Sequence, residues 1–175
     1  MPILDIASSV PVIWEKIAET RTAIINRDGY LQACNFEICL NLDLLDSLNT
    51  EPQKVNAKSP AFRELVNSLE INAILALLAG NDRRSYRRFI KLLKKHWNKS
   101  VSFEQEEDIQ IDSVQNVLDA LGFIVRKIEA LRRIARISET DEEIFKTINL
   151  NTRLKNIKKA LLEVQELFKD ISKYC

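Results

Sequence analysis

Turn-forming residues are scarce in this 175-residue sequence, which holds only three glycines and four prolines. A protein of this length built from β-sheets would need many more of them, because tight turns and hairpins depend on these two residues. Apolar residues make up 46% of the chain and charged residues 29%, a balance typical of folded globular proteins. The composition therefore predicts long helices with few connections, and it excludes disorder as the main state of the chain.

Long apolar runs are missing as well. The longest candidate, residues 71–79, is much shorter than the ~20 residues that an α-helix needs to cross a bilayer. The first residues, MPILDIASSVPVIWEKI, lack a basic segment and include Asp5, so they do not have the pattern of a signal peptide. We therefore expect a cytoplasmic protein that does not insert into a membrane.

The residues that usually bind metals or perform catalysis are few. The sequence contains one histidine and three cysteines (His96, Cys34, Cys39 and Cys175). Their spacing matches no zinc site, and the cysteines are expected to be reduced thiols. The glycines are isolated, which excludes both common glycine-rich phosphate loops, and the serine-hydrolase motif GxSxG is absent. The sequence thus predicts no metal and no cofactor, and it favours a protein without enzymatic activity.

Apolar residues at helical spacing predict several helices in the N-terminal part of the chain, residues 9–98. One is expected to begin near Pro11, and the others cover residues 30–48, 61–79 and 82–98. Arg27-Asp28-Gly29 is interpreted as a break between the first two, with one continuous helix through Gly29 as the alternative. Residues 49–60 are polar, contain two prolines and are expected to form a loop.

The C-terminal third carries two heptad patterns, which are typical of coiled coils. The first consists of Val114, Val117, Leu121, Ile124, Ile128, Leu131 and Ala135. The second consists of Leu150, Leu154, Ile157, Leu161, Val164, Phe168 and Ile171. A short turn at 138–143, with Thr140 and Glu143 as a capping box, would make the two helices antiparallel.

These segments together predict one all-α domain, a bundle of about six helices with a long antiparallel C-terminal helical hairpin. The hairpin occupies residues 112–173 and follows an acidic linker at 99–111. Several isoleucines lie outside the two heptad patterns and predict a second contact surface (Ile134, Ile137, Ile144 and Ile148). That surface is either intramolecular or a dimer interface, and we expect a homodimer.

Positive charge is concentrated in one segment. The chain has a net charge of +1, yet residues 83–99 contain eight Lys or Arg and no Asp or Glu. On a helix these side chains fall within an arc of about 160°, opposite an apolar face. They are Arg83, Arg84, Arg87, Arg88, Lys91, Lys94, Lys95 and Lys99. The pattern predicts a helix that packs on the core through one face and presents a basic strip on the other.

Such a strip needs negative charge nearby, because like charges on one helix face repel. One source is the chain itself, through the five acidic residues of segment 104–112. A second is the phosphate backbone of a nucleic acid, with RNA favoured over DNA. An anionic membrane surface is a third, but it would compete with the core for the same apolar face. We therefore expect nucleic-acid binding or internal neutralisation.

His96 falls within the apolar arc of this helix, which favours a structural role over acid–base catalysis. A catalytic His96 beside a basic strip would resemble the HEPN ribonucleases, small helical proteins of bacterial toxin and defence systems. That family carries an Arg five to seven positions before its His and forms its active site across a dimer. Here Phe89, Ile90 and Lys91 occupy those positions, so the resemblance is limited to size, helicity and basic character.

A second group of basic residues lies in the C-terminal helices (Arg126, Arg133, Arg136, Arg153, Lys155, Lys158 and Lys159). They are expected to be solvated, with Glu129 and Glu163 nearby, or to extend the basic strip if the hairpin packs beside it. The sequence thus leaves three functions open. They are a helical assembly or dimerisation module, a nucleic-acid-binding protein, and a diverged HEPN-like ribonuclease that uses His96.

Overall fold

The computed structural model describes residues 27–48, 59–79, 84–105, 113–137 and 149–172, and these are mostly helical. The helices are α2 (Arg27–Leu48), α3 (Pro60–Ser68), α4 (Asn72–Ala79), α5 (Arg84–His96), α6 (Val117–Ile137) and α8 (Leu150–Ser172). Two short strands, β1 (Val101–Ser102) and β2 (Ser113–Val114), complete the described elements. None of the helices in these ranges combines the length and apolarity needed to span a membrane.

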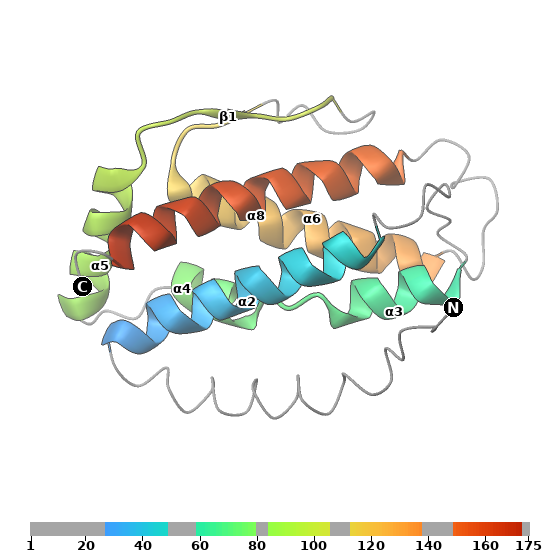
Figure 1. Cartoon of the computed structure of the whole chain (residues 1–175), viewed down its shortest axis with the longest axis horizontal. Helices are drawn as coiled ribbons and strands as arrows, with labels where there is room; N and C mark the ends of the chain where they lie inside the picture. The colour runs from blue at the N-terminus through green and yellow to red at the C-terminus, as the bar shows by residue number, and fades with distance from the viewer. Residues whose placement is uncertain (1–26, 49–58, 80–83, 106–112, 138–148, 173–175) are drawn as a thin grey trace.

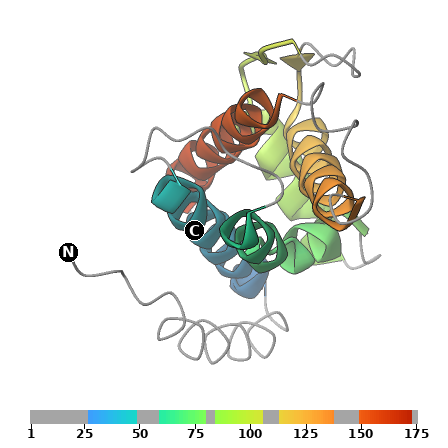
Figure 2. The ribbon, with the colours of Figure 1, turned by 90° about the vertical axis from the view of Figure 1, so that its right-hand side faces the viewer.

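The helices surround one apolar core (Figure 2). Helix α8 packs between α2 and α6, while α3 and α4 together fill the remaining side, against α6 and α2. Helix α5 lies across one end of this arrangement, where it contacts α8 and α2 (Figure 1). The basic segment is therefore at an end of the molecule rather than along its side.

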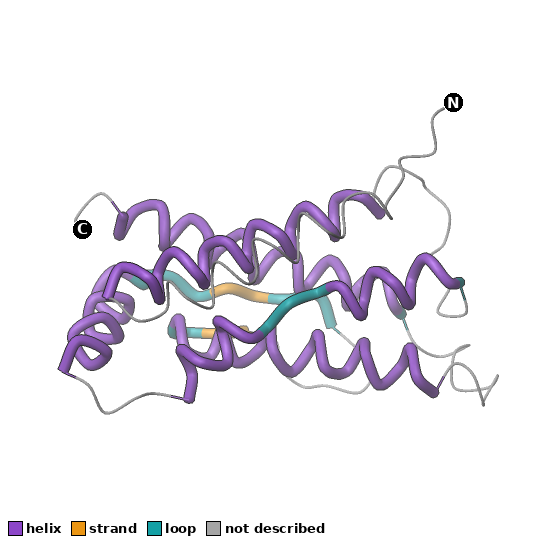
Figure 3. Tube along the Cα trace, turned by 90° about the horizontal axis from the view of Figure 1, so that it is seen from below, coloured by secondary structure: helices purple, strands orange, loops and turns teal. Residues whose placement is uncertain are grey.

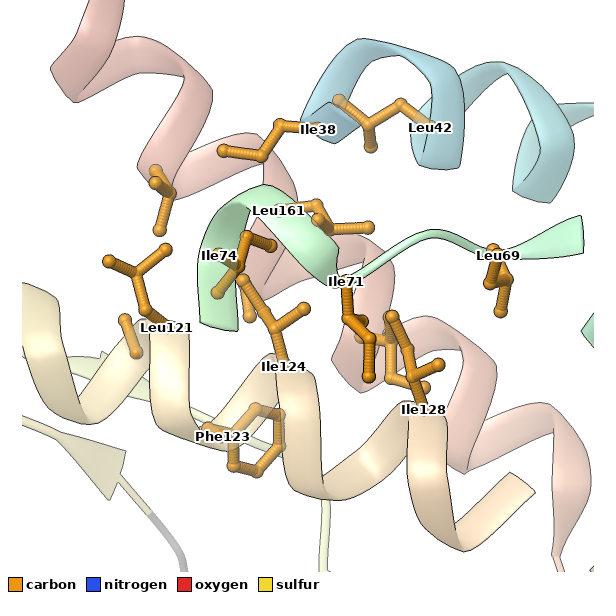
Figure 4. Packing of buried hydrophobic residues seen from close by; sticks show 14 of the residues in the cluster. Ile38, Leu42, Leu69, Ile71, Ile74, Leu121, Phe123, Ile124, Ile128 and Leu161 are labelled. Carbon is orange, nitrogen blue, oxygen red and sulfur yellow. The ribbon is translucent and has the colours of Figure 1, made fainter. Parts of the chain in front are cut away.

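The heptad residues form the centre of the core, because every member of both patterns is buried. Figure 4 shows how side chains from different helices meet there, with Ile74 of α4 between Ile38 of α2 and Ile124 of α6. Val114 belongs to β2, so α6 begins only at Val117. Of the residues outside the heptads, Ile134 is buried while Ile137 is 41% exposed.

The single helix predicted for residues 61–79 is wrong. The chain forms α3 and α4 instead, with a non-helical break between Ser68 and Asn72 (Figure 3). Ser59 caps α3 by accepting a hydrogen bond from Phe62 N at 3.1 Å, and Leu69 ends the helix in an extended conformation. The break is buried through Leu69 and Ile71, and side chains from α2 and α6 bind its backbone, so tertiary contacts outweigh local helix propensity here.

The break predicted at Arg27-Asp28-Gly29 is also wrong, because these residues form the first turn of α2. Gly29 is buried, and a buried glycine is tolerated in a helix at a cost of about 1 kcal/mol relative to alanine. The helix expected from Pro11, most of the 49–60 loop and the turn at 138–143 lie outside the described residues. So do Ile144, Ile148 and Cys175.

The predicted linker 99–111 contains regular structure that the sequence did not indicate. Val101 and Ser102 of β1 pair antiparallel with Val114 and Ser113 of β2. Phe103 then stacks on Phe123 of α6, with ring centroids 4.0 Å apart. The stacking contact holds Phe103, which directly follows β1, against α6.

Candidate nucleic-acid interface

Helix α5 is anchored by the apolar side chains at its C-terminal end. Leu93 and Trp97 are buried, and the partly buried Ile90 and Leu92 pack beside them. Trp97 continues the helical hydrogen bonding, since its backbone N donates to Leu93 O at 3.1 Å. The indole Nε1 of Trp97 is buried and has no hydrogen-bond partner among the described residues. The anchor is therefore a packing contact, and it fixes which side of α5 faces solvent.

The opposite side of α5 presents four cations to solvent. The side chains of Arg87, Lys91, Lys94 and Lys95 are all exposed. They fall within about 100° of the helix circumference and along about 12 Å of its axis. The three lysines form no ion pair with any residue in the described ranges. We call these four residues the α5 basic face.

The other predicted members of the basic strip lie elsewhere or cannot be placed. Arg83 is outside the described residues, while Arg84 and Arg88 belong to α5 without a description of their side chains. Lys99 does not belong to the strip, because α5 ends at His96. The predicted helix 82–98 is therefore shorter at its C-terminal end.

Lys99 is bound to α8. Its Nζ forms an ion pair with Glu163 and donates to Glu166 Oε2 at 3.3 Å. It also lies 5.7 Å from the centre of the Trp97 ring, within reach of a cation–π contact. Burial alone would lower the pKa of Lys99, but the two carboxylates outweigh it and raise the pKa. Lys99 thus helps to hold the C-terminal end of α5 against α8.

The described part of the linker does not support the prediction that its acidic residues neutralise the basic strip. Glu104 lies 3.9 Å from Lys155 of α8, and its backbone is bound by Asn156. The remaining acidic residues, within 106–112, are outside the described residues. Among the described residues, Glu163 and Glu166 of α8 form ion pairs near the end of α5, and both of these pairs are with Lys99.

His96 is partly buried on the last turn of α5, between the exposed Lys95 and the buried Trp97. This agrees with its predicted place near the apolar side. The nearest arginine before it whose side chain is described is Arg87, which is nine positions away on the helix. Among the described residues, no group of three or more His, Cys, Asp or Glu could hold a metal ion. In the described part of α5, the arrangement is thus an exposed basic side with a partly buried histidine at its C-terminal end.

The basic residues of the C-terminal helices do not extend the α5 basic face. Arg126, Arg133 and Arg136 are exposed on α6, which does not pack closely against α5. Glu129 accepts a hydrogen bond from Arg132 at 2.6 Å.

On α8, Lys155 and Lys159 are exposed, and Lys158 forms an ion pair with Asp46 of α2. Arg153 is buried, so its predicted solvation is wrong. Glu163, expected near these residues, pairs with Lys99 instead.

Sequence reasoning missed a buried polar cluster between α2 and the α3–α4 break. Cys34, Glu37 and Asn41 are each no more than 6% exposed, and all three bind backbone groups of residues 70–74. The sequence did contain a signal for this cluster, because helical periodicity places these residues on the face of α2 that also carries Ile38 and Leu42. Burial raises the pKa of the Cys34 thiol far above its usual range, and the nearby Glu37 adds to the effect, so Cys34 is not a reactive thiol.

Comparison with known proteins gives no relative for this chain. No protein-family model matches the sequence, no curated protein matches it, and no solved structure matches the fold. Any function must therefore be inferred from the chain's own residues and their geometry.

Proposed function

We propose that this protein binds the phosphate backbone of a nucleic acid, RNA in preference to DNA, through the α5 basic face. The observation that carries the proposal is the exposure of four cations on one side of a helix whose other side is anchored in the core. Like charges on one helix face repel one another, and a polyanion removes that repulsion while releasing its own counterions.

Phosphate contacts alone explain the composition of this face. Lys91, Lys94 and Lys95 are point charges on flexible stems, which suit phosphate oxygens better than the edges of bases. Trp97 is buried and therefore cannot stack on a base. Phe103 is engaged with Phe123. The proposed binding is thus directed by charge and shape, with little dependence on nucleotide sequence.

A fluorescence-anisotropy titration with a labelled RNA duplex tests this proposal directly. Four phosphate contacts predict that affinity falls by about a hundredfold between 50 and 200 mM monovalent salt. A DNA duplex of the same sequence measures the preference for RNA, which is expected to bind more tightly. If neither polymer binds at 50 mM salt, the proposed function is wrong.

The same samples separate binding from cleavage. We expect the RNA to remain intact on a denaturing gel after the titration, because His96 is partly buried and no arginine with a described side chain accompanies it at the HEPN spacing. Cleavage that disappears in the His96→Ala variant would instead favour the diverged ribonuclease.

We also infer that residues 112–173 form the antiparallel helical hairpin of a bundle of about six helices. The opposed colour gradients of α6 and α8 in Figure 1, and the packing between these helices, support this arrangement. The residues of both heptads are buried by contacts within a single chain. The large apolar side chains left exposed among the described residues are Leu75, Ile137 and Leu162, which are on three different helices. The homodimer expected through the isoleucines outside the heptads stays a prediction, because Ile144 and Ile148 lie outside the described residues.

A further inference from the structure

The chain that leaves α5 presents its side chains alternately to the core and to solvent. Trp97 and Val101 are buried, whereas Asn98, Ser100 and Ser102 are exposed. An extended chain that lies on the surface of a protein produces this alternation with a period of two. The three exposed side chains therefore share the outward side of the segment.

Contacts on the inward side fix this alternation. Lys99 is paired with α8, Val101 lies opposite Val114 in the β1–β2 ladder, and Phe103 stacks on α6. A rotation that turned the outward side chains toward the core would break all three contacts. The outward side of the segment is thus held toward solvent.

A fourth side chain continues the outward side onto the second strand. Ser113 of β2 lies directly opposite Ser102 in the antiparallel register, and both are exposed. Side chains of directly opposite residues lie on the same face of a ladder. Within the described ranges, none of these four side chains forms a hydrogen bond with another protein group. We call Asn98, Ser100, Ser102 and Ser113 the polar row.

The polar row differs in chemistry from the α5 basic face, which it follows along the chain. Lys95, the last member of that face, is three positions before Asn98, and Figure 1 shows the chain passing from α5 at the end of the molecule to β1. Serine hydroxyls and the asparagine amide donate and accept hydrogen bonds but carry no charge. They gain little from the attraction between charges that dominates phosphate binding. The row is therefore suited to a neutral group that both donates and accepts, beside a phosphate backbone.

We propose that the polar row binds ribose 2′-hydroxyl groups in the minor groove of an A-form RNA duplex, while the α5 basic face binds the neighbouring phosphates. This inference rests on the proposed nucleic-acid binding and adds the contacts that distinguish RNA from DNA. The minor groove of A-form RNA is wide and shallow and displays the 2′-hydroxyls, each of which donates and accepts. DNA lacks this group, so the row contributes to the affinity for RNA alone.

A triple variant separates this contribution from phosphate binding. Asn98→Ala/Ser100→Ala/Ser102→Ala removes hydrogen-bonding groups and leaves the net charge unchanged. Loss of two or three hydrogen bonds predicts an affinity for an RNA duplex that is about ten- to a hundredfold lower. The affinity for a DNA duplex of the same sequence should stay within about twofold of the wild type. The salt slope for RNA should not change, because no phosphate contact is removed.

The matched control is Asn67→Ala/Ser68→Ala. These two residues are exposed on α3, at the end of the molecule opposite α5 (Figure 1). This variant should bind both duplexes as the wild type does. Equal losses of affinity for RNA and DNA in the triple variant, or no loss for RNA, would overturn the inference.

A modified ligand tests the wild-type protein without any substitution. A 2′-fluoro RNA duplex keeps the A-form but has no 2′-hydroxyl to donate, so it should bind about tenfold more weakly than the natural RNA duplex. Equal affinity for these two duplexes would show that shape alone favours RNA, and would overturn the role of the polar row while leaving the proposed function intact. Failure of the wild type to bind either natural duplex at 50 mM salt would contradict the proposed function itself, and this inference with it.

Discussion

Asn41 and Glu70 are 29 positions apart in the sequence, yet they are joined by two hydrogen bonds of 2.6 and 2.8 Å. The side-chain amide of Asn41 pairs with the backbone of Glu70 as a neighbouring β-strand would. Asn156 of α8 binds the backbone of Glu104 in the same way, at 3.0 and 2.9 Å. Each of these two non-helical segments is thus held by a buried asparagine.

Replacing Asn41 with alanine is expected to lower the free energy of unfolding by about 2–4 kcal/mol. Stability falls for two reasons. The backbone N–H and C=O of Glu70 lose their hydrogen-bond partner, and the truncated side chain leaves a cavity in a fully buried position. Urea unfolding followed by circular dichroism measures it. Asn67→Ala, on the exposed face of α3, is the control and should change stability by less than about 0.5 kcal/mol. Equal effects of the two substitutions would contradict the role of Asn41.

The free energy of unfolding should decrease as the pH rises through neutrality, and Glu37 is the cause. Its pKa is about 7 in the folded state and 4.5 in the unfolded chain, so its stabilising contribution is complete below pH 4.5 and is lost as the pH rises through 7. Between pH 5 and pH 8 this loss amounts to about 2–3 kcal/mol relative to Glu37→Gln. Urea titrations of both proteins at the two pH values provide the comparison, and parallel pH profiles would refute the assignment.

Trp97 is expected to be the main anchor of α5. Truncation to alanine should cost about 3–5 kcal/mol, as for other large buried side chains. Trp97→Phe should cost clearly less, because it keeps most of the apolar contact and removes an indole N–H that has no partner among the described residues. Thermal unfolding of the wild type, Trp97→Ala and Trp97→Phe ranks their stabilities. A phenylalanine variant as unstable as the alanine variant would contradict the expectation that apolar contact with an aromatic ring is enough to anchor α5.

Lys99 should be dispensable for RNA binding although it belongs to the predicted basic strip. It is already paired with Glu163 and Glu166, so Lys99→Gln is expected to change the affinity for an RNA duplex by less than about twofold. The same substitution should lower stability by less than about 1 kcal/mol, and by still less in high salt. Anisotropy titrations of Lys99→Gln and Lys94→Gln, side by side, test this. A larger loss of affinity for Lys99→Gln would place Lys99 in the interface.

The sequence was informative wherever a pattern repeats over several turns. The two heptads predicted buried positions in both C-terminal helices, because a seam that recurs every seven residues admits one buried face. The division of residues 84–96 into an apolar and a basic side follows from the same geometry. Leu93 is buried while Lys94 and Lys95 are exposed, as predicted.

Features that depend on one distant partner could not be predicted. Residues 61–79 have helical spacing throughout, and the break between α3 and α4 is accompanied by contacts with Glu37, Asn41 and Arg132 of other helices. The partners of Lys99 are on α8, more than sixty positions further along the chain, and no local pattern indicates them. The pairing of β1 with β2 is equally hidden, because each strand has only two residues.

We expect the α5 basic face, and not the overall charge of the protein, to bind the nucleic-acid backbone. The most direct test of this claim compares two triple variants that remove the same charge. Lys91→Gln/Lys94→Gln/Lys95→Gln changes the basic face, while Arg126→Gln/Arg133→Gln/Arg136→Gln changes the exposed side of α6. We predict that the first variant binds an RNA duplex more than about tenfold more weakly at 100 mM salt, with a salt slope shallower by about 2 to 3, and that the second stays within about threefold of the wild type. Equal losses in the two variants, or an unchanged affinity in the first, would contradict the claim.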